Sequence, residues 1–210
     1  MSNLTFELTD GVATLTMNRP DARNALSAEM KDEFARVVPA IAADKSIRAV
    51  ILTGAGGAFC AGGDIRGMAE VRASGTATVE TWRDRMREVQ PWMRQLVELD
   101  KPLIAAVDGP AFGAGFSLAL MADFVVATPT ARFCLSFMRV GLVPDFAAMY
   151  TLPRVVGVQR AKELMLSARE VAVDEALRLG LVLEVVPADG LMDRARALAR
   201  SFVGASALGV

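Results

Sequence analysis

Residues 104–121 constrain the possible folds of this chain more than any other part of the sequence. They begin with a short apolar run that is typical of a buried strand. The run breaks at Asp108-Gly109-Pro110 and restarts through Gly113-Ala-Gly115 into an apolar segment of helical length. A tight turn that opens a helix leaves the first helical N–H groups without partners inside the helix. Such groups can bind a phosphate, a carboxylate or a developing oxyanion.

The rest of the chain alternates between strand and helix patterns. A hairpin is predicted around Asp10-Gly11, and a helix is predicted from an N-cap at Ser27 to about residue 43. Further strands are predicted at residues 49–53, 124–127, 132–134 and 183–186. Further helices are predicted at residues 74–99, with a kink or break at Pro91, and at 159–167, 174–179 and 189–202. This order predicts an α/β fold with a largely parallel sheet.

Composition limits the class of protein. The 210 residues carry 23 basic and 24 acidic side chains, which favours neither nucleic acid nor an anionic membrane surface as a partner. Without a shift in composition, we expect one domain over residues 1–210. The apolar runs are shorter than a membrane span, and the first residues do not resemble a signal peptide. Two cysteines cannot form a disulfide framework, so we expect a cytoplasmic protein.

The chain contains no histidine, which excludes Ser-His-Asp and Cys-His catalysis and the common histidine zinc sites. Ser117 lies in Gly115-Phe-Ser-Leu-Ala119, which approximates a nucleophile elbow. Without histidine, a small residue packed on a helix is the better interpretation of Ser117. A dinucleotide loop is also excluded, because Leu118 occupies the position of the third glycine.

A second glycine-rich loop follows the strand at residues 49–53 and ends at Asp64. For Asp64 alone, a helix cap is the favoured interpretation, and Cys60 is expected to be a small buried residue. Both loops follow predicted parallel strands, so they lie at the edge where open α/β folds bind ligands. One backbone N–H group from each loop would suffice for an oxyanion hole.

Asp145 follows Pro144 in an apolar neighbourhood. A buried carboxylate there would have a raised pKa, which suits proton transfer near neutral pH. Asp145 could equally be the N-cap of a helix that begins at Phe146, and the two interpretations can both hold.

These motifs together resemble the crotonase superfamily, the enoyl-CoA hydratase/isomerase family. The resemblance rests on residues 18–27, 59–65, 101–119, 141–145, 152–157 and 176–182, in that order. It implies a crotonase-like (ClpP/crotonase) ββα-superhelix, an acyl-CoA thioester substrate, no metal or redox cofactor, and a homotrimer or a dimer of trimers. The family continues with C-terminal helices, whereas this chain ends at Val210, so those helices are expected to be missing or truncated.

The resemblance also implies roles for single residues. The N–H groups of Gly63 and Ala114 would bind the thioester oxygen. The coenzyme and the acyl group would contact a further set of residues: Arg23, Ala25, Ala61, Asp64, Ile65, Phe112, Gly113, Phe137 and Leu142.

The departures from the family pattern indicate the reaction. Ser117 and Phe137 stand where a hydratase of the family carries its two glutamates, whereas Asp145 stands where several isomerases of the family carry their acid. We therefore expect enoyl-CoA double-bond isomerisation with Asp145 as the acid/base. The alternatives are another crotonase reaction, such as hydration, and a non-catalytic acyl-CoA-binding homologue.

Overall fold

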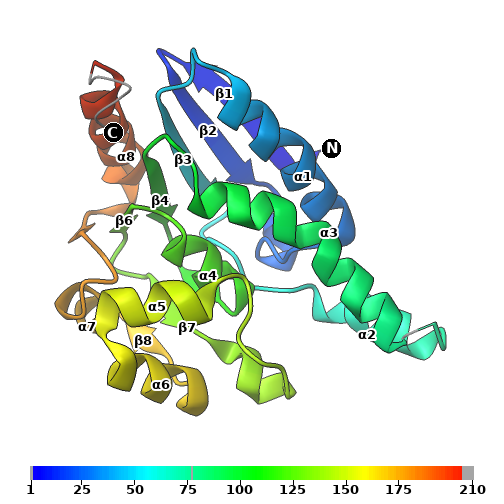
Figure 1. The fold of residues 1–210 in the computed structure, drawn as a ribbon. Helices are drawn as coiled ribbons and strands as arrows, with labels where there is room; N and C mark the ends of the chain where they lie inside the picture. Colours follow the sequence, from blue (N-terminus) through cyan, green and yellow to red (C-terminus); the bar gives the residue numbers. More distant parts are fainter. Residues whose placement is uncertain (1, 77, 205–210) are drawn as a thin grey trace.

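The computed structural model describes residues 2–76 and 78–204, and a six-stranded sheet forms the centre of the fold (Figure 1). Its strand order is β1-β2-β3-β4-β6-β9, in which β1 and β2 form an antiparallel hairpin and all later neighbours are parallel. The strands are β1 (Leu4–Thr9), β2 (Val12–Met17), β3 (Ala49–Gly54), β4 (Leu103–Val107), β6 (Phe124–Ala127) and β9 (Glu184–Val185). The predicted α/β fold with a largely parallel sheet is confirmed.

A small second sheet carries the order β5-β7-β8 beyond the carboxyl end of β4. Its strands are β5 (Pro110–Phe112), β7 (Arg132–Cys134) and β8 (Val171–Ala172). The sequence predicts only a turn at Pro110, because three residues are too few to show a strand period. Pairing with β7 is what makes this segment a strand.

Helices cover both faces of the main sheet. The helices are α1 (Ala28–Ala43), α2 (Ile65–Ala73), α3 (Val79–Val97), α4 (Ala114–Leu120), α5 (Ala148–Val156), α6 (Val158–Ser167), α7 (Val173–Arg178) and α8 (Leu191–Val203). Three short 3-10 helices are η1 (Pro20–Ala22), η2 (Ser136–Val140) and η3 (Ala188–Gly190). In Figure 1, α1 and α3 lie side by side over one face, and α8 lies over the other.

Local signals explain α1. The Ser27 hydroxyl accepts a hydrogen bond from the Met30 N–H (3.2 Å), which gives the predicted N-cap. Met30, Phe34, Val38 and Ile41 recur at helical spacing and are buried against the sheet and α3.

The prediction of one helix over residues 74–99 is wrong at its start, and of the kink or break predicted at Pro91, the break does not occur. A capping box between Thr78 and Thr81 begins α3 at Val79, five residues later than predicted. The helix then continues through Pro91 without a break. Pro91 is exposed, so the carbonyl that loses its helical partner there can bind water instead.

Candidate active site

The two glycine-rich loops meet at the carboxyl ends of β3 and β4. The Cys60 N–H donates to the Pro110 oxygen (3.0 Å), and the Phe112 N–H donates to the Cys60 oxygen (2.9 Å). Gly115, in the first turn of α4, packs directly against this loop. A Cβ on Gly115 would lie 2.2 Å from the Cys60 oxygen, so only glycine permits this approach.

The N–H groups of Gly63 and Ala114 both lack an acceptor within the part of the chain that the structure describes. Leu26 bonds to the neighbours of Gly63: its N–H donates to the Gly62 oxygen (2.8 Å), and its oxygen accepts the Asp64 N–H (3.3 Å). In such a parallel bridge the Gly63 N–H points away from Leu26. Ala114 is the first residue of α4, so its N–H has no partner inside the helix.

These two donors belong to loops in direct contact. A Cβ on Gly62 would lie 2.7 Å from the Phe112 oxygen and 3.5 Å from the Ala114 nitrogen. Gly62 has a φ of +100° and Gly113 a φ of +51°, conformations that favour glycine at both positions. The structure therefore brings together the two predicted sources of N–H groups for an oxyanion hole.

Asp145 lies in the irregular segment between η2 and α5. Its Oδ1 atom is buried and has no hydrogen-bond partner among the described residues. Burial raises the pKa of this carboxyl to about 6, and the positive charge of Lys31 on α1 partly opposes the rise. The carboxyl is therefore available for proton transfer near neutral pH.

The interpretation of Asp145 as a helix N-cap is wrong. The N-cap of α5 is Ala147, and the Ala148 N–H donates to the backbone oxygen of Asp145 (3.1 Å), not to its carboxyl. Phe146 and Ala147 have φ values of 51° and 59°, so the chain turns before the helix begins. This turn releases the Asp145 side chain from capping.

Ser117 is fully buried, which confirms its interpretation as a small packed residue. Its hydroxyl donates to the Asp145 backbone oxygen (3.1 Å) and also lies within bonding distance of the Gly113 oxygen (3.3 Å). It therefore ties the helix that carries Ala114 to the segment that carries Asp145. Cys60 is also buried as predicted, and burial raises the pKa of its thiol to about 12, which makes it a poor nucleophile.

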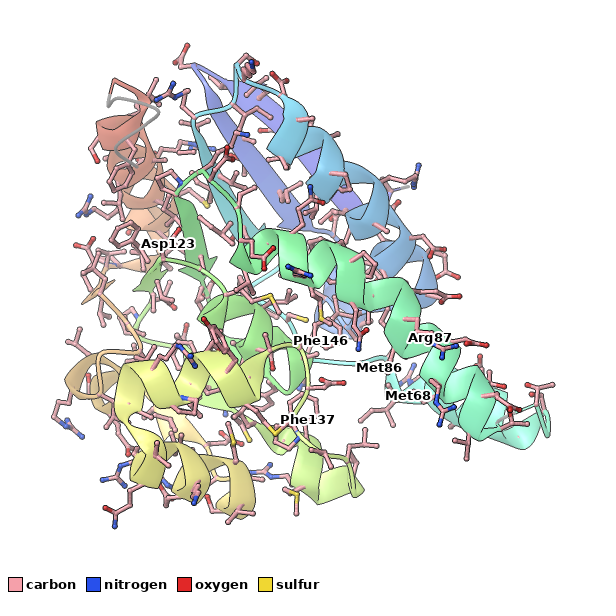
Figure 2. The ribbon with its side chains drawn as sticks, in the orientation of Figure 1. Met68, Met86, Arg87, Asp123, Phe137 and Phe146 are labelled. Atoms are coloured by element: carbon pink, nitrogen blue, oxygen red, sulfur yellow. The ribbon has the colours of Figure 1, made fainter. Side chains whose placement is uncertain are left out.

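Aromatic rings pack beside Asp145. Trp92 stacks on Phe34 (ring centroids 4.9 Å apart) and meets Phe146 edge-on (5.8 Å). Figure 2 shows Phe146 and the buried Phe137 toward the middle of the molecule. This packing fixes Phe146, the residue that follows Asp145, in the core.

The predicted acyl-pocket residues differ in burial. Phe137 is buried, whereas Leu142 is 45% exposed and touches Phe137 through a backbone hydrogen bond (3.0 Å). Phe112 and Gly113 connect β5 to α4, next to Ala114. The structure thus places Phe112, Gly113 and Phe137 in the segments around the two loops, with the Leu142 side chain turned largely to solvent.

Four of the five predicted coenzyme residues lie close together, one pair in direct contact and the other pair bridged by Arg19. The Ala61 N–H donates to the Arg23 oxygen (2.9 Å), and the Arg19 side chain bonds to both the Ala25 oxygen and the Asp64 carboxylate. The fifth, Ile65, begins α2 and is 62% exposed.

The cap interpretation of Asp64 is confirmed, because its carboxylate accepts the Gly67 N–H (3.2 Å) at the start of α2.

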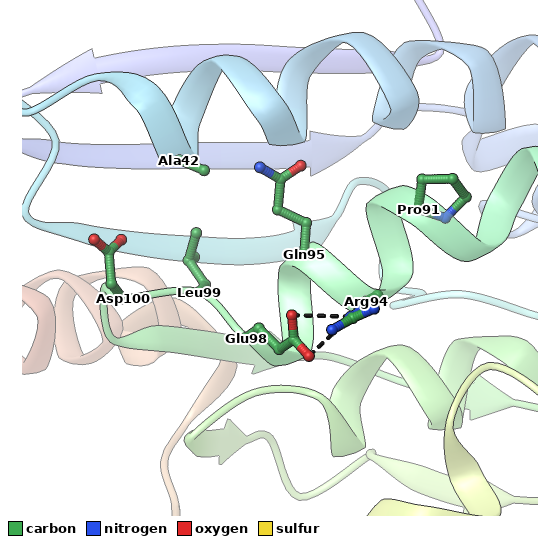
Figure 3. A pocket seen from close by; sticks show the side chains of 7 residues that line it. All are labelled: Ala42, Pro91, Arg94, Gln95, Glu98, Leu99 and Asp100. Carbon is green, nitrogen blue, oxygen red and sulfur yellow. Dashed lines mark hydrogen bonds and ion pairs between the residues drawn. The ribbon is translucent and has the colours of Figure 1, made fainter.

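A surface groove lies away from these residues. It has a volume of about 400 Å³ and is lined from the carboxyl-terminal parts of α1 and α3 (Figure 3). Those helix ends lead into the amino ends of β3 and β4, the opposite edge of the sheet from Gly63 and Ala114. None of the predicted site residues lines it. No cluster of three or more His, Cys, Asp or Glu suited to a metal occurs within residues 2–76 and 78–204.

Sequence reasoning assigned no role to Arg19, Lys31 or Met68. Arg19 belongs to the N-terminal motif at residues 18–27, and this membership was the only indication in the sequence that it has a role. Lys31 lies one helical turn before Phe34, a spacing that places both on one side of α1. The Met68 methyl group would lie 2.9 Å from a Cβ on Gly63, and Figure 2 shows Met68 at the base of the projecting α2–α3 pair.

No helix within the described ranges 2–76 and 78–204 is long and apolar enough to cross a membrane.

Comparison with known families places most of the chain in one of them. A family model described as enoyl-CoA hydratase/isomerase matches residues 7–209.

Curated relatives include proteins named isomerase and proteins named hydratase. The 1,2-epoxyphenylacetyl-CoA isomerase of Escherichia coli K12 is 40% identical over 190 residues, which cover 90% of this chain and 72% of the relative. The short-chain-enoyl-CoA hydratase of Clostridium acetobutylicum is 38% identical over 204 residues, which cover 97% of this chain and 76% of the relative.

Among solved structures, an enoyl-CoA hydratase/isomerase from Cupriavidus metallidurans CH34 is similar to this chain with a TM-score of 0.90. It is 43% identical, and the match covers 99% of this chain and 76% of that one. This likeness confirms the predicted crotonase-like fold.

Proposed function

This chain is an enzyme of the enoyl-CoA hydratase/isomerase family, and from that premise we propose that it isomerises the double bond of an enoyl-CoA thioester. The finer assignment rests on the site, because relatives of similar identity are named isomerase and hydratase. Asp145 is the proposed acid/base, and the N–H groups of Gly63 and Ala114 are the proposed oxyanion hole.

The proposed mechanism needs one carboxylate. The thioester oxygen accepts hydrogen bonds from the two backbone N–H groups. The Asp145 carboxylate takes a proton from the α- or γ-carbon, and the electron pair of that C–H bond moves into the conjugated system, where the thioester oxygen carries the negative charge. The same carboxyl returns the proton to the other carbon, and the carbonyl reforms with the double bond moved. Two N–H donors stabilise the enolate where its charge develops.

The state of the Asp145 carboxyl is the observation that carries this proposal. Its Oδ1 is buried without a partner, and its pKa is raised to about 6, mainly by burial. A general acid/base works best with a pKa near the working pH. Its neighbour Phe146 packs edge-on against Trp92, and its backbone oxygen accepts a hydrogen bond from Ser117 on α4.

Hydration is the second candidate, because a relative at 38% identity is named a hydratase. Hydration requires a water molecule that is oriented and deprotonated. The two positions at which the family resemblance expects glutamates carry Ser117, whose hydroxyl is engaged by backbone oxygens, and the buried Phe137. A single carboxylate therefore favours proton relay over addition of water.

The test supplies straight-chain and aryl 3-enoyl-CoA and 2-enoyl-CoA esters to the wild type, Asp145→Asn and Asp32→Asn. Asp32 is exposed on α1 and serves as the matched control. We expect isomerisation, with deuterium from D₂O entering the acyl chain, in the wild type and Asp32→Asn, and a loss of at least about 100-fold in Asp145→Asn. Isomerisation that survives in Asp145→Asn contradicts the mechanism, and robust hydration contradicts the reaction class. Binding without turnover or deuterium exchange would indicate a non-catalytic acyl-CoA-binding protein.

We also propose that the protein is a homotrimer or a dimer of trimers. Large apolar side chains are exposed in the segment from η2 to α6, including Val143 (67%), Met149 (59%) and Leu166 (69%). Exposed apolar surface of this kind is typical of a protein interface. Light scattering coupled to size-exclusion chromatography measures the mass, and a monomer contradicts the proposal.

A further inference from the structure

The position of Gly63 depends on a segment that has no regular secondary structure. Three backbone hydrogen bonds hold residues 61–64 to residues 23–26: Ala61 N–H to Arg23 (2.9 Å), Leu26 N–H to Gly62 (2.8 Å) and Asp64 N–H to Leu26 (3.3 Å). A shift of residues 23–26 would therefore move the Gly63 N–H with them. Whatever fixes this segment also fixes one half of the proposed oxyanion hole.

The segment itself has an unfavourable backbone. Arg23 and Asn24 have φ values of 48° and 57°, in the left-handed region that side chains other than glycine rarely adopt. Such a conformation costs about 1 kcal/mol or more per residue, so it persists only where surrounding contacts hold it.

Asn24 supplies one set of contacts, since its buried amide accepts the Arg19 N–H (2.8 Å) and donates to the oxygens of Ala55 (2.8 Å) and Ala58 (2.7 Å).

The Arg19 guanidinium supplies the second set, and it contacts both sides of the bridge. Its Nη1 atom lies 2.6 Å from the Ala25 oxygen and 3.1 Å from Asp64 Oδ2. The two side chains are 24% and 21% exposed, so the ion pair is partly shielded from water. Ala25 precedes Leu26, and Asp64 follows Gly63. One cation thus joins the N-terminal segment to the residue beside the N–H donor.

Asp64 passes this restraint on to α2. The same carboxylate accepts the Gly67 N–H (3.2 Å) at the start of that helix; burial raises the pKa of this carboxyl, but the Gly67 N–H and Arg19 together hold it below its ordinary value. Glu29 also lies within electrostatic range of both Arg19 and Asp64. Removal of Arg19 would leave two neighbouring carboxylates without their shared cation.

We propose that Arg19 is a positioning residue that holds the Gly63 N–H in place through Asp64 and the Ala25 carbonyl. This proposal rests on the proposed oxyanion hole, and it deepens it. Arg19 does not act on the reacting atoms. Through Asp64 it fixes the position of the Gly63 N–H group. Displacement of a catalytic group by about 1 Å can lower the rate about 100-fold.

Two variants test the role. Arg19→Met removes the charge and the hydrogen bonds, whereas Arg19→Lys keeps the charge on a shorter side chain whose ammonium group does not reach the position of Nη1. Arg87→Met is the matched control, because Arg87 is an exposed arginine on α3 that pairs with Asp84 (side chains 67% and 63% exposed). Asp64→Asn, alone and combined with Arg19→Met, completes a double-mutant cycle.

The first measurement needs no substrate. Amide hydrogen exchange in peptides from residues 55–70 should speed up in Arg19→Met, less so in Arg19→Lys, and not in Arg87→Met. Unchanged exchange in Arg19→Met overturns the proposal at this stage.

The second measurement reads the oxyanion hole directly. Hydrogen bonds to the carbonyl of a conjugated aryl thioester such as cinnamoyl-CoA shift its absorption to longer wavelength when it binds. We expect this shift to be largely lost in Arg19→Met, kcat to fall about 10- to 100-fold, and KM to change by less than about threefold. We expect Arg19→Lys to recover part of both the shift and kcat.

The outcomes separate the two proposals. A wild type that shows the shift but isomerises no enoyl-CoA contradicts the proposed reaction, while the loss of the shift in Arg19→Met still supports the positioning role. Faster exchange with an unchanged shift and kcat contradicts the positioning role alone. A fall in kcat equal to the fall in folded protein, or additive effects of Arg19→Met and Asp64→Asn on the shift, also overturns it.

Discussion

The raised pKa of Asp145 predicts that this carboxylate destabilises the folded protein at neutral pH. Its pKa of about 6 in the folded state lies above the ordinary value of 3.8, mainly because of burial. The folded state therefore binds the proton more tightly than the unfolded chain does. The contribution of this group to stability is fully present below pH 4 and is lost as the pH rises through 6.

The size of the effect follows from the two pKa values. At about 1.4 kcal/mol per pH unit, ionisation of Asp145 costs the folded state about 3 kcal/mol above pH 7. Asp145→Asn removes this cost. The difference between the free energies of unfolding of the variant and the wild type should therefore grow by about 3 kcal/mol between pH 3 and pH 7.5, and any effect of the amide that does not depend on pH leaves this growth unchanged.

Urea unfolding at half-unit steps of pH measures this difference. Asp32→Asn is the matched control, because its exposed side chain makes the same chemical change without removing a buried charge. The difference between Asp145→Asn and wild type should rise most steeply between pH 4 and pH 6. A difference that does not depend on pH, or that falls as the pH rises, would refute the reasoning from burial.

Three further substitutions test single contacts of the site. Ser117→Ala removes the hydroxyl bond to the Asp145 backbone, and we expect a loss of about 1 kcal/mol in urea unfolding and a fall in kcat of several-fold; an unchanged kcat would contradict a link between α4 and Asp145. Lys31→Met removes the charge that lowers the Asp145 pKa, so the acidic limb of the kcat/KM profile should move to higher pH, and a move to lower pH would contradict this sign. Asn24→Ala leaves one buried and two partly buried backbone groups without partners, and we expect it to lower the free energy of unfolding by about 3 kcal/mol, with little change contradicting its role in the left-handed segment.

The sequence predicts both loops of the site well, because the signals are local. Apolar runs followed by glycine clusters mark the ends of β3 and β4, and small residues are needed wherever two backbones come close. Gly115 shows the reason directly, since a Cβ there would collide with the Cys60 oxygen. The prediction of an N–H group at Ala114 followed from this pattern together with the family resemblance.

Contacts between distant segments could not be predicted in this way. Arg19 and Asp64 are 45 residues apart, and no spacing rule joins them. The N-cap interpretation of Asp145 also depended on the backbone that follows it. The left-handed conformations of Phe146 and Ala147 exclude it, and a bulky residue such as Phe146 gives no local sign of that conformation.

The exchange of an expected glutamate for Ser117 therefore changes more than the number of acids. A side chain at position 117 is fully buried, and its hydroxyl lies within 3.1 Å of the Asp145 backbone oxygen. An ionised glutamate at this position has no hydrogen to donate, so the bond from α4 to the Asp145 backbone would be lost. In this chain, a hydrogen bond joins the small residue at 117 to the backbone of the acid at 145, and this arrangement supports the proposal of proton relay through a single carboxylate.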